Sequence, residues 1–274
     1  DFMIAYPGDP SADEINTATK LKLFQMLSAG YDWLNLSIFG RAGIPVANNG
    51  GANAPTVAEH AILLTLAVFK RLPEHHNALV KGHWLGATRT LQMRELRGKT
   101  VGVLGFGRIG QEFARLARGF GTNILFNDTV QPPSSVREEI DAIYVPFDDL
   151  FECSDVISVH TPLVAATEGL VDARALGLMK NSAILVNTSR GPVIDEAALI
   201  GALQNDQIAG AGLDVFSVEP LEGESPLFSL KNVVLTSHIA GVTLDTWSRR
   251  IAFGFANIQR VADGREPESV VGSS

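Results

Sequence analysis

Three polar residues, Arg190, Glu219 and His238, each follow an apolar run of the kind that forms buried strands. Histidine can act as a general acid or base near neutral pH, and a neighbouring carboxylate favours its protonated form and fixes its orientation. Arginine can bind a carboxylate and polarise a ketone. Singly, the three have ordinary explanations: a surface ion pair, a solvated loop acid and a partly buried histidine. Placed together beside a nicotinamide, they supply what the reduction of a 2-oxo acid requires.

A glycine-rich turn supplies the cofactor side of that chemistry. Gly105, Gly107 and Gly110 form a G-x-G-x-x-G pattern between the apolar run 101–104 and a helical pattern over 108–118. Such glycines allow a tight turn, close approach of the backbone to a pyrophosphate, and close packing of the helix on the strand. The amino end of the helix then offers free N–H groups to the phosphates. The turn therefore predicts a dinucleotide-binding site.

Asp128 predicts which dinucleotide binds. It follows the next apolar run, 123–127, and lies 18 residues after Gly110. An acid at this place can accept hydrogen bonds from the adenosine ribose. Its charge would repel a 2′-phosphate, and Thr129 follows it with no arginine at hand. We therefore expect NAD rather than NADP.

Alternating strand and helix patterns predict the framework that positions these groups. Strands are expected at 101–104, 123–127, 142–145, 156–160, 183–187, 209–215 and 232–236, and helices at 108–118, 172–179, 195–204 and 243–262. This alternation predicts an α/β fold, a Rossmann-type doubly wound parallel sheet with right-handed crossovers. Ligands bind at the carboxyl ends of the strands in such sheets. The three polar residues of the first paragraph fall at that edge.

The amino-terminal part of the chain predicts a second, smaller α/β domain. Strands are expected at 2–6, 21–26 and 44–47, and a helix from Ser11. Thr56 and Glu59 have the spacing of a capping box, which predicts a buried helix from Thr56 to about Arg71. The mixed stretch 75–97, which contains Trp84, is expected to be an irregular arm or interface.

Composition excludes several classes of function. The chain has 274 residues, 46% of them hydrophobic and 19% charged, and a net charge of −8, which disfavours a nucleic-acid surface. Cys153 stands alone, so no disulfide framework is possible, and a reducing, cytoplasmic location is expected. No cysteine or histidine cluster has metal-ligand spacing. The longest apolar run, 61–69, is too short to span a bilayer, so no membrane partner is expected.

Several blocks of sequence, in order, carry a family resemblance. They are VGVLGFGRIGQ followed by Asp128, ISVHTPL at 157–163, LVNTSRGPVIDEAAL at 185–199, GAGLDVFSVEPL at 210–221 and LTSHIAG at 235–241. Together they resemble the D-isomer-specific 2-hydroxyacid dehydrogenases. The resemblance implies an NAD-dependent oxidoreductase that interconverts a D-2-hydroxy acid and its 2-oxo acid by hydride transfer.

The resemblance also implies a role for individual residues. It makes Arg190 the substrate-binding arginine, and Glu219 and His238 the acid–base pair. The backbone amides of Ala29 and Gly30 should receive the substrate carboxylate. The cofactor-binding positions that it implies are Gly105, Gly107, Arg108, Ile109, Gly110, Asp128, Thr161, Thr188, Arg190, Asp214, His238 and Gly241. Among these, Arg108 and Ile109 should face the pyrophosphate, and Asp214 the nicotinamide carboxamide.

The family pattern further implies how the chain is organised. An NAD-binding domain is expected over 53–242, and a flavodoxin-like substrate domain over 1–52 plus 243–274. Family members usually have roughly 40–60 further amino-terminal residues, so the substrate domain is expected to be incomplete here. A homodimer paired through the NAD-binding domain is expected, with 75–97 involved. Ser237 stands where many members have proline, a change from which we expect little.

Two other functions use the same architecture. A formate dehydrogenase is disfavoured because that branch has glutamine where Glu219 stands. An NAD(H)-sensing corepressor, a binding protein rather than a metabolic enzyme, could retain all three polar residues, although no long interaction tail is seen here. Turnover of 2-oxo acids with NADH would distinguish the three. Which 2-hydroxy acid is used does not follow from the residues.

Overall fold

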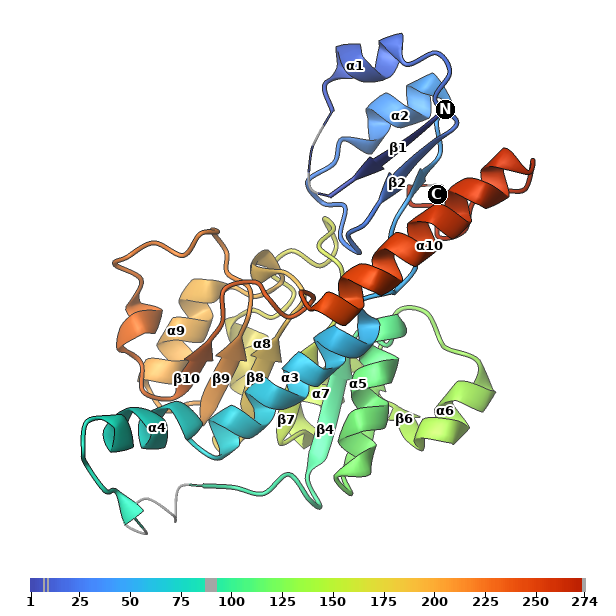
Figure 1. Cartoon of the computed structure of the whole chain (residues 1–274). Helices are drawn as coiled ribbons and strands as arrows, with labels where there is room; N and C mark the ends of the chain where they lie inside the picture. The colour runs from blue at the N-terminus through green and yellow to red at the C-terminus, as the bar shows by residue number, and fades with distance from the viewer. Residues whose placement is uncertain (7, 9, 87–92, 273–274) are drawn as a thin grey trace. The chain divides into compact units, whose positions relative to one another are not determined.

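The computed structural model describes residues 1–6, 8, 10–86 and 93–272. The chain divides into two compact units, one formed by Asp1–Thr56 with Gly241–Ser274, and the other by Val57–Ala240 (Figure 1). Each unit has its own sheet and its own apolar core. The larger unit carries most of the predicted site residues and is described first.

A seven-stranded parallel sheet forms the centre of the larger unit, in the order β10-β9-β8-β7-β4-β5-β6 (Figure 1). Its strands are β4 (Thr100–Leu104), β5 (Asn123–Asn127), β6 (Ala142–Tyr144), β7 (Val156–Val159), β8 (Ile184–Asn187), β9 (Gly210–Leu213) and β10 (Val233–Leu235). Every neighbouring pair is parallel. The strand order reverses direction between β4 and β7, and a ligand crevice opens at such a point. The predicted doubly wound α/β fold is confirmed.

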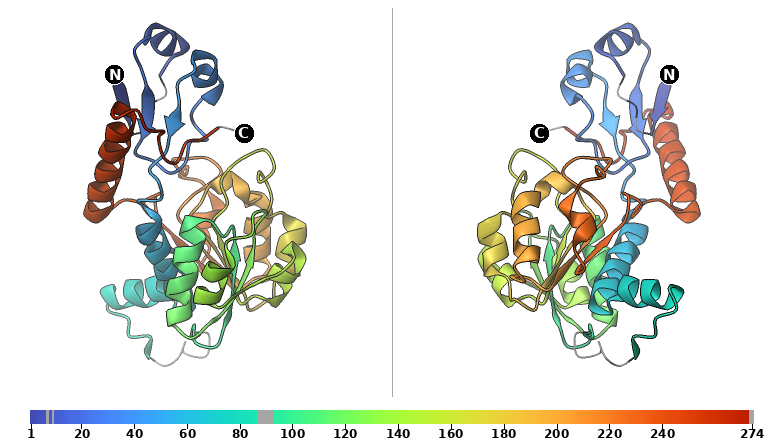
Figure 2. Two further views of the ribbon diagram at one scale, coloured as in Figure 1. Left: turned by 90° about the vertical axis from the view of Figure 1, so that its right-hand side faces the viewer. Right: turned by 90° about the vertical axis from the view of Figure 1, so that its left-hand side faces the viewer.

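Helices lie on both faces of this sheet (Figure 2). They are α3 (Ala54–Phe69), α5 (Arg108–Gly119), α6 (Ser134–Ile140), α7 (Phe147–Cys153), α8 (Ala173–Leu178) and α9 (Glu196–Gln204), with short 3₁₀ turns at Gly191–Val193 and Pro226–Ser229. A further helix, α4 (Leu72–Val80), follows α3 and has no buried residue. One core includes Leu64, Val103, Phe113, Ile140 and Val186. The core on the other face includes Leu104, Leu150, Leu176, Leu185 and Leu199. Successive strand residues thus alternate between two buried faces, which explains their unbroken apolar runs.

The smaller unit has a three-stranded parallel sheet in the order β1-β2-β3. Its elements are β1 (Phe2–Ala5), α1 (Ala12–Thr17), β2 (Leu23–Met26), α2 (Leu36–Ala42), β3 (Val46–Ala47) and α10 (Leu244–Ala262). Ser11 caps α1, and a capping box with Glu14 completes its first turn. Gly43 ends α2 with a φ of 67°, a left-handed conformation that glycine adopts without strain. The predicted elements of this part are therefore present.

Three local expectations need correction. Thr56 does not cap α3, because the helix begins at Ala54 and the Thr56 hydroxyl instead bonds that of Thr246. The stretch 75–97 is not irregular throughout, because α4 extends to Val80; residues 87–92 lie outside the described part. Helices α6 and α7 were not predicted. Within the described residues, no helix is both long and apolar enough to cross a membrane.

Candidate active site

The glycine turn lies between β4 and α5, at the point where the strand order reverses. Gly105 has a φ of 91°, and a Cβ there would lie 2.8 Å from the backbone of His160 at the end of β7. A Cβ on Gly110 would collide with the carbonyl oxygen of Gly105. By contrast, nothing lies within 4 Å of a Cβ built on Gly107, the N-cap of α5. Two glycines thus allow backbone packing, and the third leaves open space at a helix amino end, as a pyrophosphate requires.

Asp128 follows β5 and faces this turn. Its Oδ2 accepts the N–H of Phe106 at 2.5 Å, and its Oδ1 accepts the N–H of Val130 at 2.9 Å. The carboxylate therefore fixes the glycine turn, in addition to the ribose contact that its position predicts. It is half-buried, which leaves part of it accessible to a ligand. Arg108 and Ile109 begin α5 beside it, with Arg108 exposed.

Two threonines at neighbouring strand ends have buried hydroxyl groups with no hydrogen-bond partner among the described residues. Thr161 follows β7, and Thr188 follows β8. A buried hydroxyl without a partner is unfavourable, so a polar ligand along this edge would satisfy both. Together with the glycine turn and Asp128, they fit a dinucleotide lying across the carboxyl ends of β4, β7 and β8.

Arg190 is held in place by the loop that follows β8. Asn187, the last residue of that strand, accepts the N–H and hydroxyl of Ser189 and donates to the carbonyl of Arg190 at 2.9 Å. The arginine Nη1 donates to the Ser189 carbonyl at 2.7 Å. Gly191 is buried so closely against the backbone of Phe216 that any Cβ would overlap it. The loops after β8 and β9 are therefore packed closely against each other.

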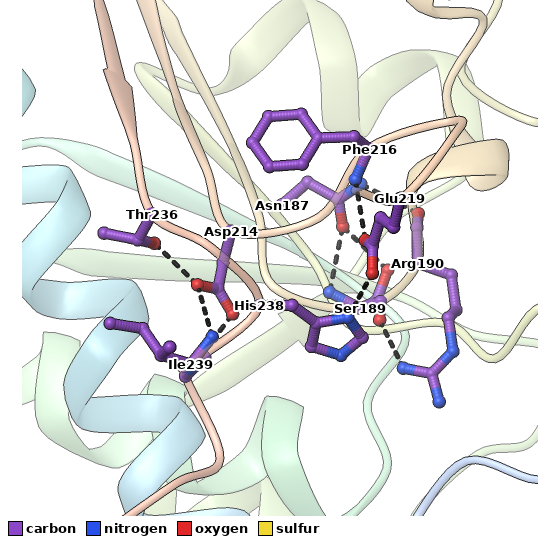
Figure 3. Close-up of polar contacts among 10 residues, drawn as sticks. Asn187, Ser189, Arg190, Asp214, Phe216, Glu219, Thr236, His238 and Ile239 are labelled. Carbon is purple, nitrogen blue, oxygen red and sulfur yellow. Dashed lines mark hydrogen bonds and ion pairs between the residues drawn. The ribbon is translucent and has the colours of Figure 1, made fainter. Parts of the chain in front are cut away.

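Glu219 and His238 meet from two different strand ends. The histidine Nδ1 lies 2.6 Å from Oε2 of Glu219, whose Oε1 accepts the N–H of Phe216 at 3.0 Å (Figure 3). The side chains are 46% and 35% exposed, so a solute can reach the imidazole. A carboxylate on Nδ1 leaves Nε2 as the nitrogen that faces other partners. The predicted pairing of these two residues is present in the geometry.

Asp214 organises the loop that carries His238. Its side chain is fully buried, and its oxygens accept the Thr236 hydroxyl at 2.6 Å and the N–H groups of Ile239 and Ala240 at 2.9 and 2.8 Å. Its backbone carbonyl accepts the N–H of His238 at 2.8 Å. The histidine has a φ of 54°, which is unfavourable for a side-chain-bearing residue unless its surroundings hold it. Asp214 supplies that restraint.

Ala29, Gly30 and Gly241 belong to the smaller unit. The carbonyl of Ala29 accepts from Asn48, and that of Gly30 accepts from Ser28. Neither Ala29 nor Gly30 has an acceptor for its own N–H among the described residues. Two fixed, unused amides suit a carboxylate, and their role as substrate binders stays a prediction, as does the cofactor role of Gly241.

Two polar residues of this edge were missed by the sequence reasoning: His60, on α3, and Thr236, just after β10. The Nε2 of His60 lies 2.9 Å from the Thr236 hydroxyl and 3.6 Å from Asp214 Oδ1. His60 is distant in sequence from the strand ends that directed the search. The sequence feature that could have revealed it is its helical spacing, because His60, Leu64 and Val68 are four residues apart and lie on one face of α3.

Comparison with known proteins identifies the family. The family model described as "D-isomer specific 2-hydroxyacid dehydrogenase, NAD binding domain" matches residues 62–240. The chain is 37% identical over 274 residues to a glyoxylate reductase of Korarchaeum cryptofilum. This match covers 99% of the chain and 82% of that protein. It is 39% identical over 241 residues to a hydroxypyruvate reductase of Thermotoga maritima. This match covers 87% of the chain and 77% of that protein.

A solved structure agrees with these relatives. Apo D-mandelate dehydrogenase of Rhodotorula graminis has a TM-score of 0.89 and 32% identity, covering 96% of this chain and 79% of that one. The resemblance noted in the sequence blocks is thereby confirmed, and so are the enzyme class and the cofactor that it implied. The chain belongs to the D-isomer-specific 2-hydroxyacid dehydrogenases and is an NAD-dependent oxidoreductase of that family.

Proposed function

We propose that the chain reduces a small 2-oxo acid to its D-2-hydroxy acid with NADH, using Arg190, Glu219 and His238. The observation that supports this most strongly is the 2.6 Å contact between His238 Nδ1 and Glu219 Oε2, at the edge of the sheet where the glycine turn lies. The carboxylate partner is itself fixed by the backbone N–H of Phe216, so the imidazole is held in one orientation, which an ordinary surface histidine does not require.

Each residue then has a defined part in the reaction. Glu219 holds Nδ1 of the His238 imidazole, so that Nε2 faces the substrate and can donate a proton to the ketone oxygen. Arg190 binds the substrate carboxylate and stabilises the negative charge that develops on the ketone oxygen. Bound NADH supplies the hydride. In the oxidative direction, neutral His238 accepts the hydroxyl proton.

The relatives direct the choice of substrates to test. Two relatives that are 37% and 39% identical to the chain are named glyoxylate reductase and hydroxypyruvate reductase. We propose that the substrate of this chain is of that size class, a short 2-oxo acid. Its identity is to be established by comparing kcat/KM across a panel that contains glyoxylate, hydroxypyruvate, pyruvate and longer or aromatic 2-oxo acids.

The test is NADH turnover with this panel, in the wild type and in two variants of Arg190. Arg190→Ala should lower kcat/KM by roughly ten- to a hundredfold because a charge-assisted contact is lost. Arg190→Lys should recover little of this, since an ammonium cannot make a bidentate contact. Near-normal kinetics of the lysine variant would contradict the role of Arg190. Oxidation of formate, or NADH binding without any turnover, would favour the two alternative functions.

We also propose that two copies pair through α4. This helix has no buried residue, and Leu79, Val80 and Trp84 at and after its end are 58%, 73% and 83% exposed. Apolar surface of this kind marks an association site. Val80→Glu should therefore yield monomers in light-scattering chromatography, and a wild type that is already monomeric would contradict the pairing. A cytoplasmic location, favoured by the single Cys153, stays part of this proposal.

A further inference from the structure

The approach of α3 to β9 places His60 beside Asp214. A Cβ on Gly212 would lie 2.8 Å from the Leu64 Cβ, and one on Gly210 would lie 3.0 Å from Val68. Four residues of helix advance about 6 Å, and two residues of strand advance about 6.6 Å. Helix and strand therefore stay in step over this distance. Four residues before Leu64 on α3 and two residues after Gly212 in the chain are His60 and Asp214, which therefore lie opposite each other. The close approach allowed by the glycines of β9 thus determines this contact.

The hydrogen bonds between these residues have a definite direction. Asp214, as a carboxylate, can only accept, so the single hydroxyl proton of Thr236 is donated to Oδ1, at 2.6 Å. The Thr236 oxygen then accepts from Nε2 of His60, at 2.9 Å. His60 must therefore carry a proton on Nε2. The three side chains form one relay, from α3 through the end of β10 to the end of β9.

The last member of the relay fixes the His238 loop. The Asp214 side chain accepts the N–H of Ile239 (Figure 3). It also accepts the N–H of Ala240, and its backbone carbonyl accepts that of His238. A buried carboxylate keeps such geometry only while its lone pairs are satisfied. The Thr236 hydroxyl is one of its donors, and His60 orients that hydroxyl. If the Thr236 hydroxyl could rotate freely, Asp214 would lose a donor and would hold the His238 loop less firmly.

We propose that His60 and Thr236 are positioning residues for His238, acting through Asp214 without touching the substrate. This rests on the proposed function only in so far as His238 is the proton donor. Reaction rate depends steeply on the placement of such a donor. Substitution of His60 or Thr236 should therefore change kcat much more than it changes the Kd for NADH.

Paired variants of Thr236 separate a hydrogen-bonding role from a packing role. Thr236→Val keeps the shape and removes the hydroxyl, whereas Thr236→Ser keeps the hydroxyl and removes a methyl group. We expect the valine variant to lose roughly ten- to a hundredfold in kcat, with a nearly unchanged Kd for NADH. The serine variant should stay within a fewfold of wild type. The reverse ranking would show that Thr236 only packs.

The same comparison applies to His60. His60→Gln retains an N–H donor and His60→Leu does not, so the glutamine variant should keep more of kcat than the leucine variant. Thr65→Val is the matched control, because among the described residues the buried Thr65 hydroxyl bonds only the Ala61 carbonyl of the same helix, at 2.8 Å. Its kcat should equal that of wild type. Equal loss of kcat in both His60 variants would overturn the relay.

Hydrogen exchange measures the loop without reference to activity. The N–H groups of Ile239 and Ala240 should exchange faster in Thr236→Val than in Thr236→Ser or Thr65→Val, as read from peptides that span 236–243 by mass spectrometry. Unchanged exchange in the valine variant would overturn the proposal, and so would faster exchange with an undiminished kcat. A wild type that reduces no 2-oxo acid would count against the proposed function alone, since exchange still reports on the relay.

Discussion

The contact between His238 and Glu219 predicts what the carboxylate contributes to turnover. Reduction needs a proton donor for the ketone oxygen, and Glu219 holds that donor through Nδ1 of the imidazole. Glu219→Gln retains a hydrogen-bonding side chain of the same size but loses the charge-assisted contact. We therefore expect kcat/KM for a 2-oxo acid to fall about tenfold in this variant, while the Kd for NADH stays nearly the same.

Oxidation provides the control for that prediction. It uses the same imidazole as the base, so Glu219→Gln should also lower kcat/KM for oxidation of the 2-hydroxy acid. His238→Ala should remove most turnover in both directions. Unchanged kinetics of Glu219→Gln in both directions would mean that this carboxylate is not coupled to the proton donor.

Asp128 has two tasks, and a conservative change separates them. Asp128→Asn keeps an oxygen that can accept the Phe106 N–H, which holds the glycine turn, but it loses the charge. It should weaken NADH binding by about tenfold, the effect of one charge-assisted hydrogen bond. It should also reduce discrimination against NADPH. A wild type that uses both cofactors equally would contradict the inference from Asp128.

The chemistry of this edge was predictable at some residues and hidden at others. Arg190, Glu219 and His238 could be found because a parallel sheet gathers whatever follows its strands. The fully buried Asp214 could be placed at the edge, but its role in holding the loop required the positions of Ile239 and Ala240. The role of His60 could not be predicted from the sequence, because its contact with Thr236 depends on how closely α3 approaches β9.

That approach is itself testable at the level of the elements. A methyl group on Gly212 would lie 2.8 Å from the Leu64 Cβ, so α3 must move away from β9. Gly212→Ala should lower the free energy of unfolding by roughly 1–3 kcal/mol, measured by chemical denaturation. Gly201→Ala is the control, since nothing lies within 4 Å of its added Cβ on α9 and a helix favours alanine. Equal stability of the two variants would contradict tight packing here.

Strands were predicted better than helices for a physical reason. Buried parallel strands such as β7 and β8 are short, mainly apolar runs followed by polar residues, a pattern with few alternatives. Helices α6 and α7 have seven residues each and only short apolar faces, so periodicity could not reveal them. The start of α3 was misplaced because Thr56, which fits a cap by type, bonds Thr246, 190 positions away.

The stability of the whole molecule should depend on pH through His160. Its Nε2 lies 2.8 Å from the Ser158 hydroxyl, its Nδ1 is buried without a partner among the described residues, and burial lowers its pKa to about 3. In the unfolded chain a histidine pKa is about 6.5. The neutral ring thus contributes stability that is fully present above pH 6.5 or so, and lost as pH falls from there toward about 3.

The expected loss is at most about 1.4 kcal/mol of unfolding free energy per pH unit, the value for one proton. His160→Gln should flatten this dependence between roughly pH 6 and 4, measured by denaturant titration at each pH. Equal slopes in wild type and His160→Gln would show that the buried ring does not stay neutral.

The central claim is that His238 and Arg190 act on the same carbonyl group. A crystal structure with NADH and oxamate, an unreactive analogue of a 2-oxo acid, tests it most directly. We expect the oxamate carbonyl oxygen within hydrogen-bond distance of both His238 Nε2 and the Arg190 guanidinium, with the nicotinamide against the oxamate carbonyl carbon. Oxamate bound away from either residue, or NADH bound elsewhere than along the glycine turn, would contradict the account.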